Sequence, residues 1–73
     1  MQAKAVPTLS LLAKALDDED AEVRYQAIQG LAGLQRAARP VIPAIRRALR
    51  DEDPRVRQEA ERLLRNIDPK VNP

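Results

Sequence analysis

Cysteine and histidine are absent from this 73-residue sequence, and a single tyrosine is its only aromatic residue. The lack of thiol and imidazole side chains excludes most nucleophile–base pairs and the usual transition-metal sites. It also means that neither a disulfide nor a zinc ion can support the small core that so short a chain buries. The sequence therefore predicts no catalytic residue, no metal and no cofactor, and it favours a protein that is not an enzyme.

Long hydrophobic runs are missing as well. No segment approaches the roughly 20 apolar residues of a membrane-spanning helix, and the first residues lead into no signal-peptide core. Together with the absence of cysteine, this predicts a soluble protein in the reducing cytoplasm.

The charge differs between the two halves of the sequence. Residues 1–35 contain three basic and five acidic residues, whereas residues 36–73 contain ten basic and six acidic residues. The two halves therefore differ in the sign of their charge, and a partner would meet a dipolar surface.

The sequence repeats itself with an offset of 33 residues. Residues 16–24 (LDDEDAEVR) align with residues 49–57 (LRDEDPRVR), and apolar positions match on both sides of this segment. A period in this range is typical of stacked helical repeats. The predicted domain covers residues 1–68. Its first unit spans about residues 5–35 and its second unit about residues 40–68, and residues 69–73 are a predicted flexible tail.

Each unit contains two apolar patterns with helical spacing. The first pattern comprises Leu9, Leu12 and Leu16, and again Ile42, Ile45 and Leu49. The second is a stripe of four residues, namely Val23, Ala27, Leu31 and Leu34, and again Val56, Ala60, Leu64 and Ile67. Asp20 and Asp53 precede these stripes and are predicted N-caps, because a carboxylate there accepts hydrogen bonds from free backbone N–H groups. Pro40 suits the first turn of the third helix. Strand alternation is absent, so the predicted fold class is all-α, with four helices.

The segment Leu-x-Asp-Glu-Asp-x-x-Val-Arg, followed by Ala and Leu at helical spacing, resembles the HEAT-like repeats first associated with phycobiliprotein lyases. The resemblance covers residues 5–68 and implies a short α-solenoid of two helix-turn-helix units. In that family an Asp in the turn and an Arg in the second helix form ladders between neighbouring units. The resemblance implies these ladder roles for Asp20, Asp53, Arg24 and Arg57. Residues 35–39 depart from the Gly-Asp turn common between such repeats, so a different connection is expected there.

The second helices of the two units differ on one flank. This flank is apolar in the first unit, where it consists of Tyr25, Ile28 and Ala32. It is polar in the second unit, where it consists of Gln58, Glu61 and Arg65. A middle repeat needs two apolar faces, whereas a terminal repeat needs a polar outer face. We therefore expect the apolar flank to pack on the second unit and the polar flank to cap the solenoid.

No comparable cap precedes the first unit. The open end consists of Thr8, Leu11, Ala15 and Gly30. Their counterparts in the second unit are Val41, Ala44, Ala48 and Leu63. Because two repeats fall short of the roughly three that usually bury a continuous core, we expect this end to associate with a second copy. The sequence thus predicts a protein–protein interaction module or scaffold that forms a homodimer through its N-terminal repeat.

An excess of arginine in and before the second unit supports an alternative. Its members are Arg36, Arg39, Arg46, Arg47 and Arg50. Their guanidinium groups could contact phosphates, so the alternative function is that of an accessory nucleic-acid binder. Interleaved acidic residues and the lack of base-stacking aromatics favour a solvated helix face instead. The acidic residues 17–20 and 51–53 lack the glycine and the alternate spacing of a calcium loop, so we expect them to serve the turns.

Overall fold

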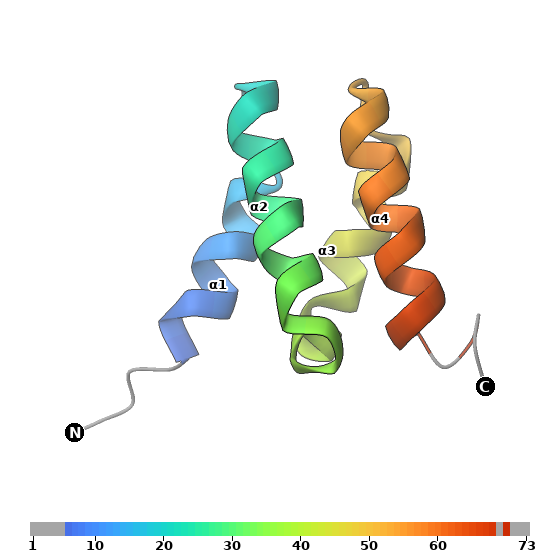
Figure 1. Cartoon of the computed structure of the whole chain (residues 1–73). Coiled ribbons are helices and arrows are strands. Elements are labelled where there is room, and N and C mark those ends of the chain that lie inside the picture. Colours follow the sequence, from blue (N-terminus) through green and yellow to red (C-terminus); the bar gives the residue numbers. More distant parts are fainter. Residues whose placement is uncertain (1–5, 69, 71–73) are drawn as a thin grey trace.

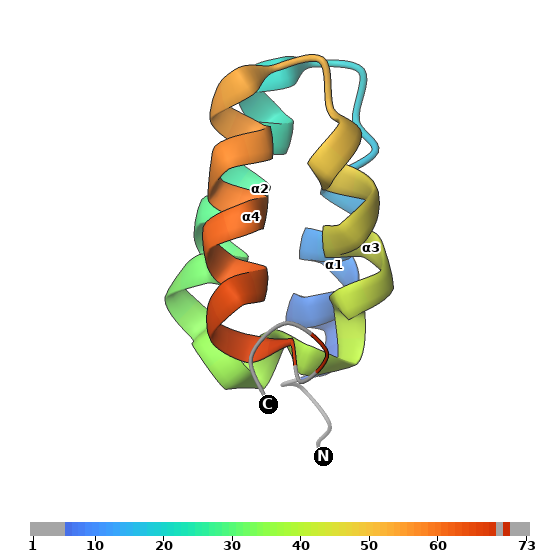
Figure 2. The same cartoon turned by 90° about the vertical axis from the view of Figure 1, so that its right-hand side faces the viewer.

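The computed structural model describes residues 6–68 and 70, and its helices run up and down in two layers (Figure 1, Figure 2). The elements in order are α1 (Val6–Ala15), α2 (Ala21–Leu34), the 3-10 helix η1 (Gln35–Val41), α3 (Ile42–Arg47), the 3-10 helix η2 (Ala48–Arg50) and α4 (Pro54–Ile67). Across the described residues there are helices and turns but no strand, so the all-α prediction is confirmed. The predicted tail at residues 69–73 lies outside the described residues, apart from Lys70.

Two antiparallel helix pairs make up the molecule. We call α1 with α2 the first hairpin, and α3, η2 and α4 the second hairpin. Seen from the side, α2 and α4 form one layer, whereas α1 and α3 form the other (Figure 2). α2 packs against α1 and α4, and η1 contacts both hairpins. The apolar stripes of all these elements therefore meet between the two layers.

The two long helices begin in the same way. Asp20 and Asp53 both have extended backbone conformations, and their side chains accept hydrogen bonds from the backbone N–H of Glu22 (2.9 Å) and of Arg55 (2.8 Å). Pro54 follows as the first residue of α4, where a missing N–H interrupts no helical hydrogen bond. Local sequence thus determines where α2 and α4 start.

The connection between the hairpins differs from the prediction. Residues 35–41 form the 3-10 helix η1, and Pro40 lies inside it rather than in the first turn of α3. α3 begins only at Ile42, with Pro43 in its first turn, and is six residues long. The break at the end of α2 occurs at Gln35, whose φ of 51° is incompatible with continuing the helix. Ala38 then anchors η1, because its side chain is completely buried in the core.

The core is one cluster between the layers. Its buried hydrophobic members are Leu16, Ala27, Ile28, Leu31, Ala38, Ala44, Ile45, Ala48, Val56, Ala60, Leu63, Leu64 and Ile67. Ile28 is completely buried, as expected for a residue between the hairpins. Most of this core lies in or beside the second hairpin, although the two hairpins have similar apolar sequences.

Candidate interaction face

The first hairpin exposes apolar side chains at the end of the molecule that faces away from the second hairpin. Leu11, Val23 and Leu34 are 64%, 38% and 37% exposed. Thr8 and Gly30 are exposed as well. We call these five residues the N-terminal face. Val23 and Leu34 belong to the predicted apolar stripe of α2, and both are partly exposed.

Four of the five counterparts of this face are buried, and the fifth, Val41 of η1, is half-buried. Ala44, Val56, Leu63 and Ile67 stand 33 residues after Leu11, Val23, Gly30 and Leu34, and their exposed fractions are 8%, 0%, 1% and 1%. Val23 and Val56 are the same residue type, so only the surroundings can explain the difference. α4 packs on α2 and η1, whereas in the part of the chain that the structure describes no hairpin precedes α1 and α2. The N-terminal face is therefore the unoccupied equivalent of a packed interface.

Two residues of the predicted open end have additional packing roles. Ala15 is half-buried and packs against the core, so it is not part of the exposed face. Gly30 is exposed, but a Cβ atom built there would lie 3.2 Å from Cδ2 of Leu12. A glycine at this position thus keeps α2 close to α1. It also leaves the surface above it flat.

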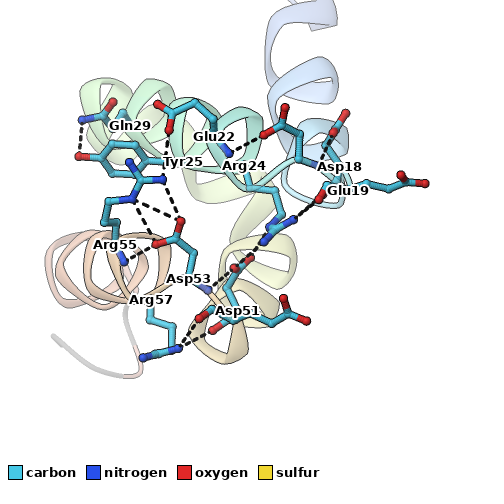
Figure 3. Close-up of polar contacts among 12 residues, drawn as sticks. Asp18, Glu19, Glu22, Arg24, Tyr25, Gln29, Asp51, Asp53, Arg55 and Arg57 are labelled. Carbon is cyan, nitrogen blue, oxygen red and sulfur yellow. Dashed lines mark hydrogen bonds and ion pairs between the residues drawn. The ribbon is translucent and has the colours of Figure 1, made fainter.

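A buried ion pair joins the turns of the two hairpins (Figure 3). Arg24 donates from Nε and Nη2 to the two carboxylate oxygens of Asp51, at 2.8 and 3.1 Å. Its Nη1 donates to the backbone oxygens of Asp18 and Glu19, at 2.8 and 3.0 Å. The side chains of Arg24 and Asp51 are only 13% and 8% exposed. Bidentate geometry and burial make this the most specific polar contact between the hairpins.

The acidic partner in this ladder is not the predicted one. Asp20 and Asp53 act at the helix starts, and Arg24 pairs with Asp51 instead. Asp51 stands two residues before the cap, where its Oδ1 also accepts a hydrogen bond from the Asp53 backbone N–H. Burial raises the pKa of Asp51, but the hydrogen bonds from Arg24 and from the Asp53 N–H outweigh it and hold the pKa below its ordinary value.

At each end of the ladder, a side chain equivalent to one member of the Arg24–Asp51 pair has no opposite member among the described residues. Arg57, the counterpart of Arg24, donates from Nη1 to the backbone oxygens of Asp51 and Glu52. Within residues 6–68 and 70, neither its Nε nor its Nη2 has a hydrogen-bond acceptor. Asp18, the counterpart of Asp51, accepts a hydrogen bond from the Asp20 backbone N–H, and the described cations form no ion pair with it. Each end thus presents half of an Arg–Asp pair.

A second polar contact connects α2 with α4. The guanidinium of Arg55 lies 4.3 Å from the ring centroid of Tyr25, and it forms ion pairs with Glu22 (3.1 Å) and Asp53 (2.9 Å). The hydrogen bonds from Arg55 lower the pKa of Asp53 to about 2. Gln29 donates a hydrogen bond to the Tyr25 hydroxyl at 3.0 Å. Tyr25 is half-buried and packs against the core, so the aromatic ring belongs to the contact between the hairpins.

Two of the five candidate phosphate-binding arginines hold the end of α4. Arg46 pairs with Asp68 at 2.8 Å, and Asp68 is almost completely buried. The hydrogen bond from Arg46 lowers the pKa of Asp68. Arg39 donates from Nε to the backbone oxygen of Ile67 at 2.9 Å. These arginines satisfy the last turn of α4 and tie it to η1 and α3.

The other three candidate arginines do not form a basic stripe either. Arg47 reaches the carboxylate of Asp17 at 3.4 Å, an exposed ion pair. Arg36 and Arg50 are exposed, and no carboxylate of the described residues pairs with them. Arg50 lies near the turns among Asp51 and other acidic side chains, whereas Arg36 lies in η1 at the opposite end of the molecule. Phosphate binding needs a clustered and unneutralised basic surface, and this arrangement does not provide one.

The opposite end of the molecule is polar. Gln58, Glu61 and Arg65 are exposed on α4, and Glu61 pairs with Arg65 at 3.1 Å. Together with Leu49 they line shallow grooves, and we call these four residues the C-terminal face. Leu49 is 39% exposed, because no further hairpin covers it in the described part of the chain.

Among residues 6–68 and 70, no group of three acidic side chains is placed to hold a metal ion. None of the helices in that part of the chain has the length and apolar character needed to cross a bilayer. The main features are the packed interface between the two hairpins, the N-terminal face as its exposed equivalent, and the Arg24–Asp51 ion pair.

These features define a class, that of all-α proteins built by stacking antiparallel helix pairs. The family model for HEAT repeats matches residues 8–71, which is most of the chain, and the protein therefore belongs to the HEAT repeat family. Neither a curated protein nor a solved structure gives a significant match.

Proposed function

We propose that this chain is a non-enzymatic protein–protein interaction module, composed of two tandem HEAT-like units of the phycobiliprotein-lyase type. The first unit corresponds to the first hairpin, and the second unit to the second hairpin. The N-terminal face is the binding surface, and its ligand is a second copy of the chain. The observation that carries this proposal is the contrast between Leu11, Val23 and Leu34, which are exposed, and their buried counterparts.

Burial of apolar surface supplies the driving force. A fully covered aliphatic side chain contributes about 1.5–3 kcal/mol relative to the exposed state. The C-terminal face is a poor occupant, because covering Leu11 and Val23 with it would desolvate the charges of Glu61 and Arg65. A twofold contact between two N-terminal faces avoids this cost and closes the assembly.

Sedimentation of matched leucine variants tests the proposal. Leu11→Glu places a charge in the N-terminal face, whereas Leu49→Glu makes the same change at the C-terminal face. We expect the parent and Leu49→Glu to dimerise with increasing concentration and Leu11→Glu to remain monomeric. A parent chain that keeps the 8.2 kDa mass at high micromolar concentration, or equal loss in both variants, would overturn the proposal.

Nucleic-acid binding has no comparable support. Arg39, Arg46 and Arg47 are engaged within the chain, and the single aromatic is covered by Arg55. A salt-dependent shift of a DNA probe at micromolar protein concentration would favour that alternative.

A further inference from the structure

We infer that the second copy docks antiparallel, so that α2 of one copy lies along α2 of the other in the opposite direction. The acidic turn of each first hairpin then lies beside the η1 end of the second copy. This inference rests on the self-association proposed above and specifies its geometry.

The two ends of the first hairpin differ in net charge, although Lys14 and Arg24 lie near the acidic end. The turn before α2 contains Asp17, Asp18, Glu19 and Asp20, all of them exposed. Residues 23–50 contain no acidic residue at all. Figure 1 places this turn and η1 at opposite ends of α2. One end of the hairpin is therefore acidic, and the other carries the unpaired guanidinium of Arg36.

Only two twofold arrangements bring the N-terminal faces together with their helices aligned. With the axis along the helices, the two acidic turns lie side by side, and so do the two η1 segments. With the axis across the helices, each acidic turn lies beside the partner's η1. Like charges repel and opposite charges attract over a few ångströms, most strongly at low salt. Electrostatics therefore selects the axis across the helices.

The apolar side chains fit the same arrangement. Val23 lies near the acidic turn and Leu34 near η1. They are eleven positions apart in the sequence, which is about 16 Å along a helix. In an antiparallel pair, Val23 of each copy lies opposite Leu34 of the other, and Gly30 lies between them.

Disulfide cross-linking tests this pairing directly, because the chain has no cysteine of its own. Val23→Cys and Leu34→Cys are made separately, and each is oxidised alone and in an equimolar mixture. A disulfide requires Cα atoms about 4.4–6.8 Å apart. We expect the mixed Val23→Cys/Leu34→Cys disulfide to form and neither variant to cross-link with itself. Homotypic disulfides, or reduced dimers that do not cross-link in the mixture, would overturn the antiparallel geometry while leaving self-association intact. A monomeric parent would overturn both.

A charge reversal provides a second test, with opposite signs for the two arrangements. In the antiparallel dimer, Arg36→Glu faces the acidic turn of the second copy, so its dissociation constant should rise about two- to five-fold at low salt. In the other arrangement the same change would relieve repulsion between two Arg36 side chains and lower the constant. Arg62→Glu on the exposed surface of α4 is the control with the same change of net charge, and it should have no effect on the constant. Tighter association of Arg36→Glu would overturn the inference.

Discussion

The first and second hairpins have nearly the same apolar pattern, yet they bury it to different extents. Val23 is 38% exposed and Val56 is not exposed at all; Leu34 is 37% exposed and Ile67 is 1% exposed. The spacing of apolar residues thus specifies a helix and its inward face. How much of that face is buried depends on whether another hairpin packs on its N-terminal side. The first hairpin covers the second hairpin in this way, whereas no hairpin covers the first in the described part of the chain.

The largest expected effect compares these two valines directly. Val56→Asp should unfold the protein, because it places a charge in a fully apolar site without a partner, a loss of several kcal/mol. Val23→Asp, the same change 33 positions earlier, should lower the free energy of unfolding of the monomer by less than about 1 kcal/mol. Urea titrations followed by far-UV circular dichroism, at concentrations below the dimerisation range, measure both. Equal losses would show that the two positions do not differ in burial.

A smaller effect separates the two turn aspartates. Asp51→Asn should cost about 1–3 kcal/mol, because it removes the charged acceptor of Arg24 from a nearly buried site. Asp18→Asn should cost almost nothing, since the amide oxygen still accepts the hydrogen bond from the Asp20 N–H. A double-mutant cycle with Arg24→Ala should give coupling for Asp51 and none for Asp18. Coupling at both positions would contradict the assignment of Asp51 as the ladder acid.

Acid should destabilise the folded chain. The pKa of Asp53 is lowered to about 2, and those of Asp51 and Asp68 lie below their ordinary value, which is about 3.9 in an unfolded chain. The unfolded state therefore binds more protons in this range, and stability falls as the pH decreases from about 4 towards about 2. Urea midpoints against pH measure this loss. Asp53→Asn should flatten the curve, whereas an unchanged curve would exclude Asp53 as a contributor.

The smallest expected effect distinguishes two glycines of α2. Gly33→Ala should stabilise the monomer by about 0.5–1 kcal/mol, because alanine favours a helix and the added Cβ meets no atom within 4 Å. Gly30→Ala should gain less, since its Cβ would press on the Leu12 side chain at 3.2 Å. Thermal melts at low protein concentration compare the two variants. A larger gain at position 30 would mean that α1 and α2 are less closely packed there.

Much of the fold could be predicted from the sequence because its signals are local. Helical spacing and the two aspartate caps suffice to predict α2 and α4, and the offset of 33 residues indicates stacked helix pairs. The third helix was less predictable. The positive φ of Gln35 and the position of Pro40 within a 3-10 helix depend on how Ala38 packs, which no local pattern reports.

The candidate site could be predicted only in part, for a physical reason. Leu11 and Gly30 stand out because their counterparts differ in size, whereas Val23 and Leu34 look like their counterparts and differ only in what covers them. Similarly, consecutive acidic residues in each turn do not indicate which carboxylate faces the arginine. The signal available was the distance from the cap: Asp18 and Asp51 both stand two residues before it.

The stacking of Arg55 on Tyr25 gives the molecule an optical label. Because tyrosine is the only aromatic residue in the chain, its ultraviolet absorption and emission arise from one place, the contact between α2 and α4. Near-ultraviolet signals therefore report whether the two hairpins are joined, while far-ultraviolet signals report whether the helices exist. Divergence of the two during unfolding would reveal hairpins that separate before they melt, and no labelling chemistry is needed to observe it.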